Sequence, residues 1–252
     1  MDYDYRKGKE RVDEILNNAI TITKNNGIPK DDKFTFKNGY YDWVTAIFID
    51  IRDSSPLFSK KGLNDKKKTA KLIRAFTSEI IEILRDSDDL KEIGIRGDCV
   101  YAIYYTSTKD KELECANKTF YINTYLNMLN KLLEEKDQPT FKAGIGMATD
   151  QELVIKAGRN RSGINSKVWI GNAVTRASNL SGHGEKIFSG NRLVYSSTSY
   201  NNFIEGLKKR NSSENVENWF TKYTDSDGEV CYYADIIKKD FNNWIKNGMK
   251  DE

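Results

Sequence analysis

Residues 43–50 read Trp-Val-Thr-Ala-Ile-Phe-Ile-Asp, a short run of β-branched and aromatic side chains that ends on an acid. The run is apolar on both of its alternating faces, which is typical of a central strand in a covered sheet. Asp50 closes the run. We therefore expect a sheet to be built outward from this strand, with Asp50 at its carboxyl end.

The sequence after this strand predicts a helix, a hairpin and a second helix. Residues 65–85 and 112–135 carry apolar side chains at i, i+3, i+4 spacing, which indicates amphipathic helices. Between them, residues 90–96 and 99–105 are strand-like and are joined by Gly97-Asp98, a dipeptide typical of a tight hairpin turn.

Another strand is expected at residues 140–148, with residues 151–157 as its hairpin partner. The order strand, helix, strand, strand, helix, strand is the ferredoxin-like βαββαβ pattern, an α+β fold with both helices on one side of an antiparallel sheet. Its first and third strands are neighbours in the middle of the sheet. Asp50 should therefore lie near Asp98.

The rest of the chain carries shorter signals. Residues 5–26 and 171–180 are expected to be helical, residues 217–236 to form a last hairpin, and residues 241–246 a short closing helix.

Composition excludes several classes of protein. The 252 residues include 40 Lys and Arg against 37 Asp and Glu, so a net charge of +3 argues against a dedicated nucleic-acid or membrane-surface binder. Three cysteines and one histidine argue against a disulfide framework and a zinc site. The absence of a long apolar run or a secretory h-region leaves the cytoplasm as the expected location.

Two carboxylates that meet without a partner repel one another, and a divalent cation between them relieves that repulsion. Oxygen ligands suit Mg²⁺ or Mn²⁺. The loop after Asp50 contains Ser54 and Ser55, whose hydroxyls could bind phosphates. Together these features indicate two-metal phosphoryl or nucleotidyl transfer. The alternative is that Asp50 and Asp98 are ordinary strand-end and turn residues.

Four motifs in order resemble those of the class III nucleotidyl cyclases. Phe48-Ile-Asp-Ile51 followed by Ser54-Ser55 resembles their first metal motif, and Gly97-Asp98-x-x-x-Ala102 resembles the second. Residues 141–146 look like their glycine-containing strand, and residues 169–178 resemble the helix that follows. The similarity runs in register over about residues 40–236.

The resemblance implies a reaction and an assembly. In this family of phosphorus–oxygen lyases, two divalent cations (Mn²⁺ or Mg²⁺) bind a nucleoside triphosphate, and the ribose 3′ oxygen attacks the α-phosphate to give a 3′,5′-cyclic nucleotide and pyrophosphate. By the resemblance, Asp50 and Asp98 bridge both cations and the Ile51 carbonyl binds one of them. The family's active sites lie between two chains, so a head-to-tail homodimer is implied.

Two departures from the family concern the base. The family's purine-reading Lys position holds Gly94, and its purine-reading Asp position holds Val168. Since the loss of polar readers removes discrimination for purines, we infer a pyrimidine. The stretch Asp50-Ile-Arg-Asp-Ser-Ser55 is similar to the first motif of the bacterial pyrimidine cyclases of Pycsar anti-phage systems. The resemblance then implies that UTP becomes cyclic UMP, which signals to a separate effector that binds cyclic nucleotides in antiviral defence.

Two further departures concern catalysis. Thr175 stands where the family has its transition-state Asn, and Asn179 stands where it has its transition-state Arg. Arg176, next to the first position, could supply the charge, because a guanidinium stabilises a phosphoryl oxygen well. The candidate phosphate-binding residues are Arg52, Ser54, Ser55 and Lys222, and the candidate base-binding residues are Arg96, Gly94, Val168, Trp169 and Tyr41.

Three alternatives to a uridylate cyclase stay open on the sequence: a cytidylate cyclase that makes cyclic CMP from CTP, a purine cyclase with unusual base readers, and a non-catalytic nucleotide-binding module. Thr175 and Asn179 favour the last of these. We expect an N-terminal helical extension over residues 1–37, a cyclase catalytic domain over 38–237 and a short C-terminal helix and tail over 238–252.

Overall fold

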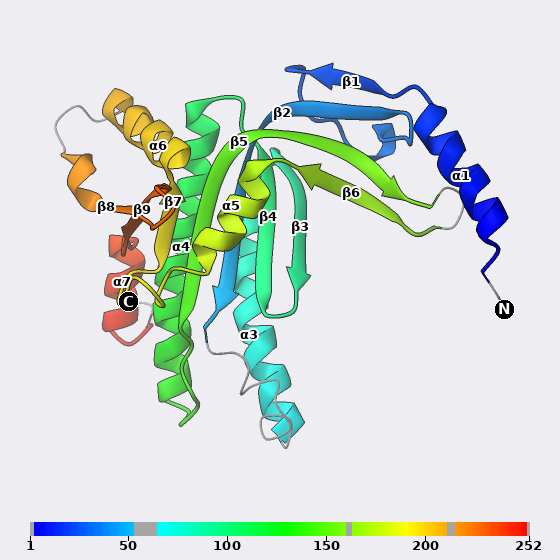
Figure 1. The fold of residues 1–252 in the computed structure, drawn as a ribbon. Coiled ribbons are helices and arrows are strands. Elements are labelled where there is room, and N and C mark those ends of the chain that lie inside the picture. The colour runs from blue at the N-terminus through cyan, green and yellow to red at the C-terminus, as the bar shows by residue number, and fades with distance from the viewer. Residues whose placement is uncertain (1–2, 53–64, 160–162, 211–214, 251–252) are drawn as a thin grey trace. The chain divides into compact units, whose positions relative to one another are not determined.

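The computed structural model describes residues 3–52, 65–159, 163–210 and 215–250 (Figure 1). Contacts divide the chain into two compact units. The first unit contains residues 1–42 and 152–170, and the second contains residues 43–151 and 171–252. None of the helices in the described part of the chain is both long and apolar enough to cross a lipid bilayer.

The second unit contains most of the secondary structure. Its helices are α3 (Lys66–Arg85), α4 (Lys109–Glu134), α5 (Asn172–Ser181), α6 (Ser197–Arg210), the 3₁₀ helix η3 (Val216–Trp219) and α7 (Lys239–Lys246). Its strands are β3 (Leu90–Arg96), β4 (Cys99–Tyr105), β7 (Leu193–Ser196), β8 (Thr221–Thr224), β9 (Val230–Ala234), and parts of β2 (Asn38–Ile51) and β5 (Ala143–Gly158).

The main sheet has the strand order β3-β4-β2-β5-β7-β9-β8. The first four strands in that order, with α3 and α4, form the expected ferredoxin-like βαββαβ arrangement, so the α+β prediction is confirmed. Strands β2 and β4 run antiparallel with Asp50 directly opposite Cys99. The sheet is not purely antiparallel, because β7 adds to β5 in parallel.

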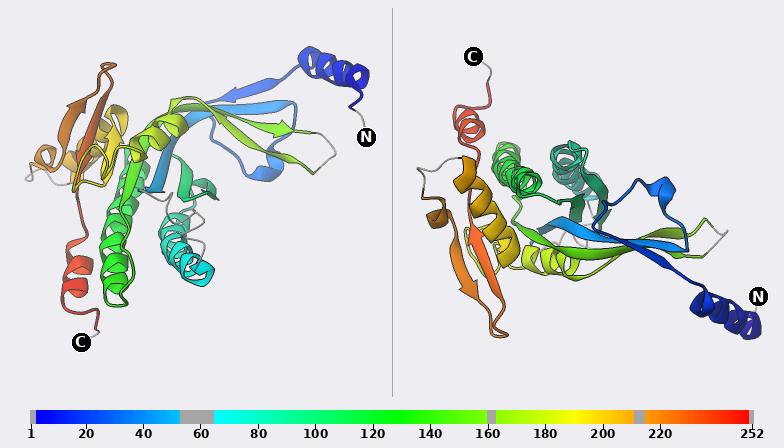
Figure 2. Two further views of the ribbon diagram at one scale, coloured as in Figure 1. Left: turned by 60° about the horizontal axis from the view of Figure 1, so that its bottom comes forward. Right: turned by 90° about the horizontal axis from the view of Figure 1, so that it is seen from above.

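Helices cover both faces of this sheet. The main core cluster joins Ile47 and Ile49 of β2 to Phe76 of α3 and Leu126 of α4. Helix α5 packs on the opposite face from α3 and α4 (Figure 2). It comes so close to β5 that a Cβ on Gly144 would lie 2.0 Å from the Ser181 carbonyl oxygen. Only a glycine permits this contact.

The first unit is smaller. It holds α1 (Tyr5–Asn17), β1 (Thr21–Lys24), the 3₁₀ helix η1 (Asp31–Lys33), β6 (Asn165–Ile170) and the remaining parts of β2 and β5. Strand β1 pairs in parallel with β2, and β6 pairs antiparallel with β5.

Two predicted elements in this unit are wrong. The helix expected over residues 5–26 ends at Asn17, because the β-branched residues 20–23 favour a strand and pair with β2 instead. The turn expected before residue 151 does not form, and β5 continues to Gly158 with β6 as its hairpin partner. Residues 149–151 lack a glycine or proline that would reverse the chain.

Candidate active site

Asp50 and Asp98 lie at the same end of the central strands. Asp50 is the penultimate residue of β2, and Asp98 lies in the two-residue turn that joins β3 to β4. The turn forms because Gly97 adopts a left-handed conformation, with φ of 64°. The carboxylates are close enough that the charge of Asp98 raises the pKa of Asp50.

Burial is the larger cause of the raised pKa of Asp50, since it disfavours the charged carboxylate. Arg52 acts in the opposite direction. Its Nη2 donates a hydrogen bond of 2.9 Å to Asp50 Oδ2, and its positive charge lowers that pKa. The balance leaves the pKa of Asp50 above its ordinary value.

Arg52 also connects Asp50 to the end of α5. Its guanidinium donates to the Ser181 carbonyl at 2.6 Å and to the Gly182 carbonyl at 3.2 Å. Only 11% of its side chain is exposed. A guanidinium satisfies carbonyl oxygens at a helix C-terminus and also opposes the negative end of the helix dipole. In this structure Arg52 therefore orients Asp50, and its binding of phosphate stays a prediction.

The carboxylate pair fits divalent cations. Within residues 3–52, 65–159, 163–210 and 215–250, no group of three or more His, Cys, Asp or Glu side chains is placed to hold a metal ion. Mg²⁺ needs no such group, because it commonly binds one or two carboxylates, water and the phosphates of the substrate. Asp50 and Asp98 supply this number of carboxylates, and Ile51 follows as the last, buried residue of β2.

A second group of side chains lies on β3 and β4, the strands that the turn with Asp98 joins. Gly94 of β3 is directly opposite Tyr101 of β4, and a Cβ on Gly94 would lie 2.7 Å from the Tyr101 hydroxyl. Tyr101 donates to Glu92 at 2.9 Å, and its ring stacks on Phe48 at 5.3 Å. Burial and the neighbouring Glu92 raise the pKa of Tyr101 to about 12, although the charge of Arg96, at the exposed end of β3, acts to lower it.

Tyr101 was missed by the sequence analysis. Its position in the second metal motif gave no sign that its ring covers Gly94. The register between β3 and β4 provides that information, and it depends on the pairing of the two strands.

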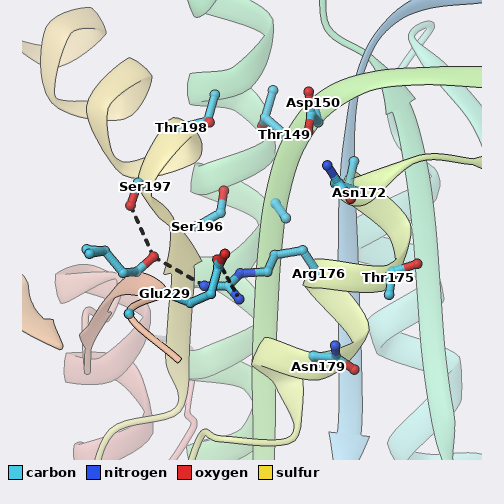
Figure 3. A pocket seen from close by; sticks show the side chains of 14 residues that line it. Thr149, Asp150, Asn172, Thr175, Arg176, Asn179, Ser196, Ser197, Thr198 and Glu229 are labelled. Carbon is cyan, nitrogen blue, oxygen red and sulfur yellow. Dashed lines mark hydrogen bonds and ion pairs between the residues drawn. The ribbon is translucent and has the colours of Figure 1, made fainter. Parts of the chain in front are cut away.

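The three catalytic candidates line one cavity of about 670 Å³ in the second unit. Helix α5 contributes Thr175, Arg176 and Asn179, and the other walls come from the middle of β5, the end of β7, the start of α6 and the β8–β9 hairpin (Figure 3). Neither Asp50 nor Asp98 lines this cavity.

Arg176 is held by groups from the β8–β9 hairpin. Its Nη1 lies 3.0 Å from Glu229 Oε2, and its Nη2 donates to the Val230 carbonyl at 3.3 Å. In Figure 3 the Glu229 carboxylate lies beside the Arg176 guanidinium, and a dashed line marks their ion pair. Glu229 was also missed by the sequence analysis, because it stands 53 residues after Arg176 and belongs to no motif that we identified.

A buried acid lies behind this cavity. Glu112 of α4 is 2% exposed and accepts hydrogen bonds from Thr149 at 2.7 Å and Asn202 at 2.8 Å. Burial raises its pKa to about 7, although these hydrogen bonds act to lower it. Thr149 itself lines the cavity and is also hydrogen-bonded to Ser199 at 2.9 Å. Glu112 thus supports the cavity wall, and no sequence motif pointed to it.

The remaining candidates are spread over the chain. Lys222 lies on β8 opposite Tyr232, is exposed and does not line the cavity. Tyr41, Val168 and Trp169 belong to the first unit, where Val168 is exposed and Trp169 is opposite Val154. Ser54 and Ser55 lie outside the described residues.

Comparison with known proteins identifies relatives of the whole chain. No family model matches it. A uridylate cyclase from Treponema porcinum is 47% identical over 251 residues, a match that covers 100% of this chain and 84% of that protein. A uridylate cyclase from Gulbenkiania mobilis is 31% identical over 249 residues and is matched over 97% of this chain and 96% of its own.

Solved structures share the fold at lower identity. The guanylyl cyclase Cya2 superimposes with a TM-score of 0.58 and 16% identity, over 81% of this chain and 97% of its own. A class III adenylyl cyclase-like ATP-binding protein from Pseudomonas aeruginosa reaches a TM-score of 0.65 with 16% identity, over 96% of this chain and 49% of its own. The described fold is therefore that of a class III cyclase catalytic domain.

Proposed function

Because the chain belongs to the uridylate cyclases, within the class III nucleotidyl cyclases, we propose that it converts UTP into 3′,5′-cyclic UMP and pyrophosphate. The single observation that supports this chemistry most directly is the pair of carboxylates, Asp50 and Asp98, at one end of the central strands.

In this proposal Asp50, Asp98 and the Ile51 carbonyl hold two divalent cations, Mn²⁺ or Mg²⁺. When bound, the cations would neutralise the triphosphate and favour the ionised ribose 3′ oxygen. Arg52 keeps the Asp50 carboxylate oriented through its 2.9 Å hydrogen bond. Because Arg52 also holds the end of α5, the position of Asp50 depends on that helix.

Arg176 is the residue that we assign to the transition state. A guanidinium that is already oriented can stabilise charge on the α-phosphate without rearranging. Glu229 and the Val230 carbonyl provide this orientation. Thr175 and Asn179, on the same helix and lining the same cavity, are placed to donate further hydrogen bonds to the substrate.

The active site is proposed to be shared between two copies of the chain. The metal-binding carboxylates and the Arg176 cavity belong to the same unit, yet the carboxylates do not line that cavity. In a homodimer with two-fold symmetry, the carboxylates of one copy face the Arg176 cavity of the other, and two equivalent sites result.

The base is proposed to lie against β3 and β4. Gly94 removes a polar purine reader, and the Tyr101 ring fills the space beside it. A pyrimidine is smaller and has a π-face that can stack on a tyrosine. Arg96 is the nearby donor that we assign to the base, while Tyr41, Val168 and Trp169 are kept as further candidates. A cytidylate cyclase is the alternative.

The decisive experiment incubates the protein with Mn²⁺ and each of the four ribonucleoside triphosphates, and separates the products by chromatography and mass spectrometry. Cyclic UMP from UTP supports the proposal. Cyclic CMP from CTP as the main product would make the protein a cytidylate cyclase, and cyclic AMP or GMP would exclude a pyrimidine site. Binding without any product would indicate a non-catalytic module. The Asp50→Ala protein is the matched control.

The product is proposed to act as a second messenger in anti-phage defence, sensed by a separate effector. This part rests on the similarity of residues 50–55 to the first motif of Pycsar cyclases. It is tested by measuring cyclic UMP in phage-infected cells that express the chain or its Asp50→Ala variant. An unchanged level after infection would contradict it.

A further inference from the structure

The first unit exposes more apolar side chains than it buries. Among its described residues, the buried apolar side chains are Ile28, Phe34 and Val154. Its exposed large apolar side chains are Tyr3, Tyr5, Val12, Ile15, Leu16, Ile20, Ile22, Ile164, Val168 and Ile170. Exposed apolar side chains mark a site of interaction where several of them lie next to one another, as Val12, Ile15 and Leu16 do at helical spacing.

Helix α1 presents the clearest part of this surface. Val12, Ile15 and Leu16 are 53%, 64% and 77% exposed, and Gly8 is the buried residue of the helix. An isolated helix of 13 residues is only marginally stable in water, because most helices are stabilised by packing one face against something. Helix α1 therefore needs a partner for its apolar face.

The spacing of that face suits another helix. Tyr5, Gly8, Val12 and Ile15 follow one another at intervals of three and four residues, which places them in one stripe. This is the pattern of a two-helix seam, in which the Tyr3 ring of the same chain covers Gly8, since a Cβ there would lie 2.1 Å from the Tyr3 hydroxyl.

The charges of α1 specify which helix fits. Residues 5–11 contain four basic and one acidic side chain, whereas residues 12–17 contain two acidic and no basic side chains. A second copy of α1 in antiparallel orientation sets the basic half of each helix against the acidic half of the other. A parallel copy would oppose like charges at both ends, which destabilises pairing.

The ion pair of Lys9 and Asp13 shows how the charges of two antiparallel copies of α1 can complement each other. Lys9 and Asp13 form an ion pair four residues apart, so they lie on one side of the helix. Lys9 precedes Leu16 by seven residues, or two helical turns, so the two side chains lie on the same side of α1. The Lys9–Asp13 pair therefore lies along the edge of the apolar stripe. In an antiparallel pair the same flanks face each other, so Lys9 of each copy meets Asp13 of the other.

We propose that α1 is a self-association helix, which packs antiparallel on α1 of a second copy of the chain through Val12, Ile15 and Leu16. This goes beyond the proposed function, which requires two copies at the active site but assigns no role to α1. The pairing is isologous, as expected for a two-fold dimer.

The first test replaces Leu16 by Glu and measures the dimer dissociation constant of the full-length protein by sedimentation velocity. The matched control is Asn17→Glu, which introduces the same charge one residue later and away from the stripe. Leu16→Glu should weaken the dimer at least about tenfold and Asn17→Glu less than about twofold. Circular dichroism establishes that both variants fold. Equal dissociation constants for the two folded variants would overturn the proposal.

The second test examines the orientation. Lys9→Glu and Asp13→Lys should each weaken self-association, because each sets like charges opposite one another. An equal mixture of the two variants should pair more tightly than either alone, since both interhelical contacts again join opposite charges. Fluorescence energy transfer between labelled variants reports the mixed dimer. If the mixture pairs no more tightly than the single variants, the antiparallel arrangement is wrong.

The third test addresses a membrane as the alternative partner. The probe is a vesicle of phosphatidylcholine and phosphatidylglycerol, with binding measured by flotation. Binding that Leu16→Glu abolishes, together with an unchanged dimer constant, would overturn the proposal in favour of a lipid surface. UTP cyclisation is measured on the same samples. If the parent protein makes cyclic UMP but its dimer does not depend on α1, this inference alone is refuted. If α1 pairs but no cyclic nucleotide forms, the proposed function alone is refuted.

Discussion

At the scale of single residues, the second unit contains two acids in unusual surroundings. Asp50 shares one end of the sheet with Asp98, and its pKa is raised by burial and by the nearby charge of Asp98. Glu112 is buried among hydroxyl and amide groups. The first pair is suited to cations, whereas Glu112 contributes to the wall of the Arg176 cavity. Substitution of Asp98 and of Glu112 should distinguish the role in cation binding from the role in the cavity wall.

Replacement of Asp98 by Asn should abolish most cyclase activity, because one of two charged metal ligands is lost. The remaining activity should require a Mn²⁺ concentration at least about tenfold higher than the parent protein does. The variant should unfold at the same urea concentration as the parent or a higher one, since the repulsion with Asp50 is removed. The first effect is measured as cyclase activity at increasing Mn²⁺ concentrations, and the second as the midpoint of urea denaturation. A less stable variant with full activity would show that Asp98 is a structural residue.

Replacement of Glu112 by Gln should change how stability depends on pH. Burial raises the pKa of the folded Glu112 to about 7, above its value of 4.5 without the fold. The protonated form therefore favours folding, so its contribution is complete below pH 4.5 and is lost as the pH rises to about 7. At about 1.4 kcal/mol per pKa unit, the loss approaches 3 kcal/mol.

Glu112→Gln should therefore flatten the free energy of unfolding over this pH range, as measured by urea denaturation. The control is Glu114→Gln, at an exposed position two residues after Glu112 on the same helix. If the free energy of unfolding depends on pH in the same way in both variants, the raised pKa does not belong to Glu112.

At the scale of elements, α5 links the two groups of candidate residues. Its side chains Thr175, Arg176 and Asn179 line the cavity, while the Ser181 carbonyl at its end accepts a hydrogen bond from Arg52. Gly144 on β5 permits this packing. Any change that moves α5 away from β5 should therefore affect Asp50 and Arg176 together.

Gly144→Ala should cost roughly 1–3 kcal/mol of stability, because its Cβ would lie 2.0 Å from the backbone oxygen of Ser181 and the helix must shift. Gly94→Ala is the matched control, since its Cβ would meet the end of the flexible Tyr101 side chain, which can turn away. Urea denaturation compares the two. Equal stabilities would show that α5 does not depend on a close approach at Gly144.

At the scale of the whole molecule, the proposed shared site makes Asp50 and Arg176 separable. Asp50→Ala and Arg176→Ala should each be almost inactive. In an equal mixture about half of the dimers are mixed, and each of these retains one intact site, so activity should return to roughly a quarter of the parent value. Cyclic nucleotide formation measures the recovery. No recovery, although subunit exchange is observed by energy transfer, would place both residues in the same site of one chain.

Local sequence patterns predicted much of the fold. The helical spacing of residues 65–85 and 112–135 predicted α3 and α4, and Gly97-Asp98 predicted the hairpin that carries Asp98. Such patterns suffice because helix periodicity and turn geometry depend on neighbours in the sequence. The βαββαβ order then implied that the strands of Asp50 and Asp98 are adjacent.

The contacts that orient the candidate side chains came only from the tertiary structure. Arg52 meets Ser181 across 129 residues, Arg176 meets Glu229 across 53, and Glu112 meets Asn202 across 90. No local periodicity encodes which side chains face each other over such separations. They are brought together by the pairing of strands and the packing of helices. For this reason the sequence identified Asp50, Asp98 and Arg176 but not the contacts that hold these side chains in place.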